Sequence, residues 1–357
     1  MTKPRSRLAL CALGSLGVLS GLGTVGLWVG GASQGLAQDR GEKKSATAGV
    51  VQAAKKLEEG LSESQRAALV FAFEDEDQRR RWSNLPTGIV ARAGLKMGDL
   101  TPEQRDASYQ VVRAALSPRG YEKVLQIVES DEVLKKQSGR GGRLNFGADE
   151  FYLSFVGKPS ETAPWMLQFG GHHLGINVTF AGERSTMAPS FVGAQPAVYQ
   201  IEGKTRRPLG AEVDKSYALL KTLSEAQRKK AVLGFEVRNL VLGPGRDGQM
   251  VEPEGIPGSE LSESQQSQLI DLASEWTNML PDAIAKEKLE EMRKNVAETW
   301  FAWSGSTEPG APAYFRIHGP TVFIEFAPQS MGGDPNNHIH TMYRDPNNDY
   351  GKKWWNP

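Results

Sequence analysis

Hydrophobic and polar positions follow two different periods along the chain. Residues 46–137 and 211–295 carry the spacing typical of helices, whereas residues 143–201 and 299–351 form short β-type runs separated by glycine and proline. Blocks of helices beside two β blocks predict an α+β fold with a largely antiparallel sheet. We expect the two sequence-distant β blocks to share one sheet covered by the helices, which makes residues 38–357 a single discontinuous domain.

One short sequence motif, which recurs four times, predicts where helices begin. A Ser or Thr is followed three residues later by Gln at four places, which start at Ser62, Thr101, Ser224 and Ser262. The hydroxyl can accept a hydrogen bond from a free helix N–H, and the glutamine can reach back to the capping residue. The irregular spacing of the four phrases excludes a solenoid, and it favours convergent capping over a duplicated helical pair.

The amino-acid composition argues against several classes of function. The chain has 42 basic and 42 acidic residues, so no basic excess favours nucleic acid as a partner. Its single cysteine, Cys11, leaves no basis for a disulfide, a thiol nucleophile or a cysteine-ligated metal in the folded part.

The N-terminus predicts export. Three basic residues within the first seven precede a long apolar stretch at residues 8–30, and small residues follow up to Ala37. This pattern is typical of a secretory signal peptide over residues 1–37, with a periplasmic, cell-surface or extracellular destination. The apolar stretch is also long enough to span a bilayer, so an uncleaved N-terminal anchor is the alternative. We expect contact with a membrane only through this segment, and only if it stays uncleaved.

All the histidines of the chain lie in the two β blocks: His172, His173, His318, His338 and His340. In a strand, His338 and His340 would share one face about 7 Å apart, which suits two ligands of one metal ion. Strand alternation around His172 and His173 would turn the two rings to opposite faces, unless the glycines at 170–171 form a bulge. We therefore expect His173 to be functional and His172 to be a hydrogen-bonded core histidine.

A polar face is also predicted on a hairpin near the C-terminus. A two-residue turn at Gly319-Pro320 would pair His318 with Thr321, Arg316 with Phe323, and Tyr314 with Glu325. The opposite face would be apolar and packed in the core.

Two functions follow from these patterns. In the first, one divalent ion (Zn, Cu, Fe or Mn) is bound by His173, His338 and His340, and Glu325, Arg316 and His318 act as candidate catalytic residues. In the second, a metal-free module binds a small-molecule or anionic ligand through Arg316, Tyr314, Trp303 and Arg344. His172 and Asp345 are further candidate pocket residues in the metal-binding interpretation. Metal-independent acid–base catalysis and a purely structural polar lattice remain as alternatives.

Several motifs together resemble a known family. They are RWSNLP at 81–86, LSPRGY at 116–121, GHHL at 171–174, FAW at 301–303, RIHGPT at 316–321, and HIH with RD at 338–345. In this order they resemble, over residues 50–351, an uncharacterised family catalogued as domain of unknown function 3500. The resemblance implies an exported protein and supplies no activity, substrate or cofactor. The chain ends in KKWWNP, whereas members of that family often end with a further histidine.

Overall fold

A computed structural model describes residues 46–138, 144–331 and 333–355, which lie in one compact unit, Lys44–Pro357. The predicted signal peptide or anchor at residues 1–37 falls outside the described residues. The domain boundary at residue 38 stays a prediction. Within the described ranges, no helix is long and apolar enough to cross a membrane.

The helices fall into two blocks. The first contains α1 (Ala46–Glu59), α2 (Glu63–Leu69), α3 (Glu76–Arg79), α4 (Pro102–Ala115) and α5 (Pro118–Ser138). The second contains α6 (Gly210–Thr222), α7 (Glu225–Ala231), α8 (Glu263–Thr277) and α9 (Asp282–Lys294). The predicted helix starts are confirmed, because α2, α4, α7 and α8 each begin with a complete capping box.

The two β blocks form one mixed, mostly antiparallel sheet, which confirms the predicted fold class. The first block contributes β3 (Tyr152–Val156), β4 (Trp165–Gly171), β5 (Leu174–Ala181), β6 (Arg184–Thr186) and β7 (Ser190–Ala194). The second contributes β11 (Trp300–Gly305), β12 (Ala313–Gly319), β13 (Val322–Pro328) and β14 (Ile339–Arg344). Three two-residue strands come instead from the stretches predicted to be helical: β1 (Val70–Phe71), β2 (Leu95–Lys96) and β10 (Ile256–Pro257). The strand order is β1-β3-β4-β5-β7-β14-β13-β12-β11-β10, with β2 on β3 and β6 on β5. The short strands β8 (Tyr199–Ile201) and β9 (Lys204–Arg206) pair with each other.

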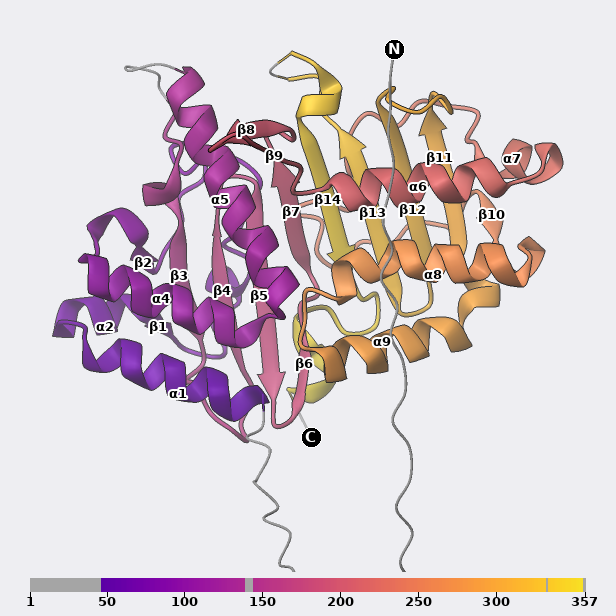
Figure 1. Ribbon diagram of the computed structural model, residues 1–357. Coiled ribbons are helices and arrows are strands. Elements are labelled where there is room, and N and C mark those ends of the chain that lie inside the picture. The colour runs from indigo at the N-terminus through magenta and orange to yellow at the C-terminus, as the bar shows by residue number, and fades with distance from the viewer. Residues whose placement is uncertain (1–45, 139–143, 332, 356–357) are drawn as a thin grey trace, which may run out of the picture. The chain divides into compact units, whose positions relative to one another are not determined.

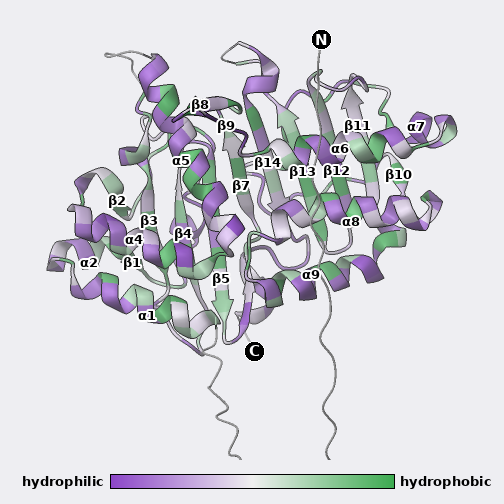
Figure 2. Cartoon of the chain, in the orientation of Figure 1, coloured by the Kyte–Doolittle hydropathy of each residue, from purple (hydrophilic) through white to green (hydrophobic). Residues whose placement is uncertain are grey.

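The two faces of the sheet are covered differently. Helices lie along one face (Figure 1), and their residues alternate between hydrophobic and hydrophilic (Figure 2). The core under them includes Ile317, Ile324 and Tyr343 of the strands. On the other face, the segment 233–255 is held to strands β11, β13 and β14 by hydrogen bonds. Gln78 of the one-turn helix α3 donates hydrogen bonds to Ser154 and Gln168 on this face, and Thr179 donates to the Tyr350 carbonyl oxygen of the 3-10 helix Asp349–Trp354. The face opposite the long helices is therefore covered by irregular chain and short helical turns, and it carries most of the polar side chains of β12 to β14.

The hairpin of β12 and β13 differs from the predicted register by two residues. His318 pairs with Phe323 and Arg316 with Glu325, and the turn lies at Pro320-Thr321. Because side chains alternate with a period of two, a shift of two residues leaves every side chain on its predicted face. The predicted β pattern also ends early, since residues after Arg344 form a turn and the 3-10 helix Asp349–Trp354 rather than a strand.

The chain repeats one order of elements. A helix pair, a short strand, a 3-10 turn, a second helix pair, another 3-10 turn and four longer strands occur first over residues 46–194 and again over residues 210–344. The first half carries β1, α3 and β6 in addition, and the second carries the 3-10 helix Pro335–Asn337. The sheet order is symmetric about the antiparallel neighbours β7 and β14. Gly94 and Gly255 occupy equivalent positions, both at positive φ, and a Cβ on either would lie 2.2–2.3 Å from a carbonyl oxygen of the neighbouring strand.

The capping glutamines follow the same repeat. Gln65 and Gln104 exchange side-chain hydrogen bonds of 3.1 Å, and Gln227 and Gln265 exchange equivalent bonds of 3.0 Å. Each half of the molecule thus joins two helix N-termini through their capping residues. The four capping motifs thus mark the helix N-termini of a structurally repeated helical pair, and the preference for convergent capping over duplication stays a prediction.

Candidate metal centre

His172 and His173 form the two-residue turn between β4 and β5, so neither lies in a strand. The expectation drawn from strand alternation was therefore based on the wrong local structure. No bulge forms at the glycines, because Gly170 and Gly171 are ordinary members of the ladder. A Cβ on Gly170 would lie 2.4 Å from the Leu174 carbonyl oxygen, which explains why glycine is needed there. His173 adopts a left-handed φ of 60°, a conformation that non-glycine residues adopt mainly in turns.

His338 and His340 enter the site from β14 and the residue before it. His338 ends the short 3-10 helix Pro335–Asn337, and His340 pairs with Gly193 of β7 and Ala327 of β13. Their neighbour Ile339 belongs to the core under the helices. His338 and His340 therefore project from the face opposite the long helices, as the spacing of two residues predicts.

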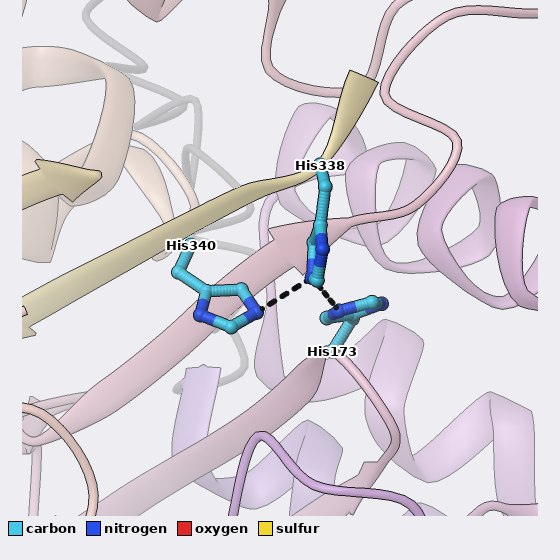
Figure 3. A group of neighbouring side chains, drawn as sticks. All are labelled: His173, His338 and His340. Atoms are coloured by element: carbon cyan, nitrogen blue, oxygen red, sulfur yellow. Dashed lines mark hydrogen bonds between the residues drawn. The ribbon is translucent and has the colours of Figure 1, made fainter. Parts of the chain in front are cut away.

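The three imidazoles converge through the same ring atom (Figure 3). Nε2 of His338 lies 2.9 Å from Nε2 of His173 and 3.0 Å from Nε2 of His340. All three side chains are at most 6 % exposed. The segments that bring them together are separated by more than 160 residues of chain, and they meet because β7 lies between β5 and β14 in the sheet.

Burial keeps these imidazoles neutral at pH 7. Desolvation lowers the pKa of His173 and of His340 well below the usual value, and neighbouring histidines add to the effect. Desolvation also lowers the pKa of His338, although its hydrogen bond to the Met331 carbonyl acts in the opposite direction. Neutral rings have a nitrogen lone pair available, which is the form that binds a metal ion.

The Met331 carbonyl fixes the tautomer of His338. Nδ1–H of His338 donates to this oxygen at 2.5 Å, since a carbonyl can only accept. Nε2 of a neutral His338 then carries one lone pair, and two ring nitrogens lie within 3.0 Å of it. The single lone pair of His338 Nε2 cannot accept good hydrogen bonds from both His173 and His340, because the two rings lie in different directions. A ring held through Nδ1–H by a backbone carbonyl is also the usual arrangement of a metal-ligating histidine.

A second group of ligand-type atoms shares His173. Nδ1 of His172 lies 2.6 Å from Oδ1 of Asp131, and the His172 ring lies against the His173 ring with centroids 3.6 Å apart. Asp131, on α5, is buried and was not identified from the sequence. Asp131 lies on the same helix face as the apolar residues Val124, Ile127 and Val128. A single carboxylate on a face that packs in the core was the sequence signal that could have identified it.

The candidate catalytic residues are not part of this cluster. Glu325 is fully buried, and its carboxylate accepts hydrogen bonds from Tyr314 Oη at 2.7 Å and from the backbone N–H groups of Val241 and Leu242 at 2.7 and 2.8 Å. Desolvation raises the pKa of Glu325. It therefore serves as an anchor for the segment 233–255, and its oxygens are already engaged.

The other two candidate catalytic residues are also engaged elsewhere. Arg316 is paired with Glu254. His318 lines a separate surface depression with Pro253 and Trp300, and burial together with the Arg316 charge lowers the pKa of His318 to about 4. The expectation that His318 and Glu325 complete the histidine pocket is not met. Glu325 is hydrogen bonded to Tyr314 and to the segment 233–255, and His318 lies on β12, which β13 separates from β14.

The remaining candidate pocket residues are dispersed as well. Trp303 lies in the core under the helices, stacked against Phe315, so it is not on the polar face. Arg344 donates to the carbonyl oxygens of Leu242 and Gly243 and pairs with Asp247 and Asp349. Asp345 accepts a 2.5 Å hydrogen bond from Lys288 of α9. Trp303, Arg344 and Asp345 thus lie in three different environments rather than in one pocket.

Comparison with known proteins gives one match. The family model described as Protein of unknown function (DUF3500) matches residues 43–352. No curated protein and no solved structure matches the chain.

Proposed function

Because the chain belongs to the DUF3500 family, whose description assigns no activity, we propose from the side-chain geometry that this protein binds a divalent transition-metal ion through His173, His338 and His340. The observation that carries the proposal is the convergence of three buried Nε2 atoms, with neighbouring atoms 2.9 and 3.0 Å apart. Ligands that lie about 2.0–2.1 Å from one ion need to be only slightly farther apart than this.

The donor set indicates which metal fits. Three neutral imidazoles without thiolate suit zinc, copper or iron, whereas manganese prefers carboxylate and water oxygens. The hydrogen bond from His338 Nδ1 to Met331 orients one ring for coordination. An ion held by three imidazoles keeps a coordination position for water or a substrate atom, where it supplies Lewis-acid chemistry.

The metal-free alternative has less support. It requires Arg316, Tyr314, Trp303 and Arg344 to present one recognition face. Trp303 packs under the helices, and the other three side chains are hydrogen bonded to Glu254, Glu325 or the segment 233–255. A ligand would have to displace these internal partners.

Metal analysis of two histidine variants tests the proposal. We expect His340→Ala to lose about one equivalent of tightly bound Zn²⁺ or Cu²⁺, because it removes one of three ligands. The matched control is His318→Ala, which removes a histidine outside the cluster and should leave the metal content unchanged. Elemental analysis after dialysis measures both. Unchanged metal content in His340→Ala would contradict the proposal.

We also infer that the protein is exported, on the basis of its basic, apolar and small-residue N-terminus. N-terminal sequencing of the protein recovered from the cell envelope or the medium should find a start at Gln38. A full-length product confined to the cytosol would contradict export. A full-length product in the membrane fraction would identify the segment as an uncleaved anchor.

A further inference from the structure

We propose that a second metal ion binds beside the first, held by Asp131, His172 and His173, with the imidazole of His173 bridging the two ions. This inference rests on the proposed function, since it shares one ligand with the first centre. A carboxylate oxygen of Asp131, a ring nitrogen of His172 and a ring nitrogen of His173 all lie within 4.8 Å of one another. All three side chains are at most 5 % exposed.

The unpartnered nitrogen of His173 supports a bridging role. Nε2 of His173 belongs to the first centre, where it lies 2.9 Å from Nε2 of His338. Nδ1 of the same ring is buried and has no hydrogen-bond partner. A buried polar atom without a partner costs free energy unless something binds it. A metal ion on Nδ1 would use the one coordination position of this ring that the first centre leaves free.

The charge around Asp131 also favours a cation. Oδ1 of Asp131 contacts His172 Nδ1 at 2.6 Å, and Oδ2 accepts a hydrogen bond from the Gly147 N–H at 2.6 Å. Among the described residues, His172 is the one side chain that is hydrogen bonded to this carboxylate. No described lysine or arginine pairs with it, so a divalent ion would supply the charge that a buried carboxylate requires.

Binding is balanced by proton release. In the metal-free protein Nδ1–H of a neutral His172 donates to Asp131, and a neutral His173 carries one proton on its ring. The second ion would bind Asp131 Oδ1, His172 Nδ1 and His173 Nδ1. The His172 proton then moves to Nε2 of the same ring, so that this ring stays neutral. The ring proton of His173 passes to solvent, because both nitrogens of a bridging imidazole must be deprotonated. No oxidation or reduction is involved.

Counting the bound ions in matched variants tests the second site. Metal-free protein is titrated with Cu²⁺, and the number of tightly bound equivalents is measured by calorimetry and elemental analysis. We expect two equivalents for the wild-type protein and for His318→Ala. One equivalent is expected for Asp131→Asn, which keeps the size of the side chain, and one for His340→Ala. His173→Gly, which tolerates the positive φ of the turn, should weaken both sites.

Electron paramagnetic resonance distinguishes a bridge from two independent sites. Two Cu²⁺ ions joined through His173 should be magnetically coupled, so their integrated signal should fall below that of two isolated ions. The single ion left in Asp131→Asn should give a full uncoupled signal. His172→Gln provides a second variant with the same expectation, and circular dichroism checks that each variant is folded.

The outcomes separate the two proposals. A wild-type protein with one equivalent that is lost in His340→Ala and retained in both Asp131→Asn and His172→Gln overturns the second site and leaves the first intact. Two uncoupled equivalents would retain the second site and overturn the bridge. A protein that takes up no Cu²⁺ or Zn²⁺ overturns both.

Discussion

Ile324 lies at the centre of β13 with its side chain fully buried in the core under the helices. Replacing it with Asp would bury a charge with no cationic partner nearby. We expect Ile324→Asp to lower the free energy of unfolding by roughly 3–5 kcal/mol, since a buried unpaired carboxylate must be desolvated or protonated.

The matched control for this position is Ile324→Val, which removes one methylene and should cost only about 0.5–1.5 kcal/mol. Urea denaturation followed by circular dichroism measures both variants. Equal stability of Ile324→Asp and Ile324→Val would show that this face of the hairpin does not form the core.

At the residue scale, the sequence identified the three histidines that converge, with an argument that was only partly right. His338 and His340 share a face for the reason given, because alternation is a local property of a strand. His173 was selected by the same rule, yet it lies in a turn where that rule does not apply. Asp131 was missed, because its contact with His172 forms only when α5 packs against the sheet.

At the element scale, the reciprocal capping glutamines predict a specific coupling. Gln104 closes the capping box of α4, exchanges hydrogen bonds with Gln65 and donates to the Gly60 carbonyl oxygen at 2.9 Å. We expect Gln104→Ala to destabilise the protein by about 1–2 kcal/mol, because it affects two helix N-termini at once. Thermal and urea denaturation measure the loss.

Gln110 in the same helix provides the control, since its exposed side chain contacts only Asp106 at 3.5 Å. Gln110→Ala should therefore change stability by less than about 0.5 kcal/mol. A double-mutant cycle of Gln65→Ala with Gln104→Ala should give a non-zero coupling energy. Additive effects of the two changes would contradict the cross-helix role of the pair.

The elements themselves could be predicted to different degrees. Helix starts are encoded within four residues, so Ser62, Thr101, Ser224 and Ser262 were located correctly. The turn of the β12–β13 hairpin was misplaced, because Gly319 followed by Pro320 satisfies one turn type while the observed register places Pro320-Thr321 in the loop. The prediction of which side chains share a face stayed correct, because the register was wrong by an even number of residues.

At the scale of the whole molecule, the buried histidines make stability depend on pH. Burial lowers the folded-state pKa of His173, His338 and His340 below the unfolded value of about 6.5. Between these values the unfolded chain binds more protons than the folded chain, so the free energy of unfolding falls as the pH falls. The loss begins near pH 6.5 and continues as the pH falls toward the lowered folded-state pKa values of the three rings. His318, whose pKa burial lowers to about 4, adds to the decline in the same direction.

Urea denaturation of the metal-free protein at pH 7.5, 6 and 5 measures this dependence. We expect His340→Ala to show a shallower decline than the wild-type protein, because one buried imidazole is gone. Bound metal should shift the onset of the decline to lower pH, since protons then compete with the ion for the rings. A flat profile between pH 7.5 and 5 would contradict the neutral, buried state of the cluster.

The repeated order of elements was the least predictable feature of the fold. The four capping motifs can be read directly from the sequence. The equivalence of the two halves, however, depends on the strand order, which involves contacts between residues more than a hundred positions apart. Local patterns do not encode such contacts. The duplication becomes evident only when β7 and β14 are seen side by side at the centre of the sheet (Figure 1).

The repeated order of elements divides the candidate ligands between the two halves of the chain. The first half contributes His173 and the second contributes His338 and His340, while the turn equivalent to His172-His173 in the second half is Pro320-Thr321. Neither half therefore carries all three histidines. An ion bound as proposed would join the turn after β4 to the start of β14, so metal uptake would report that both halves have folded and that β7 has paired with β14.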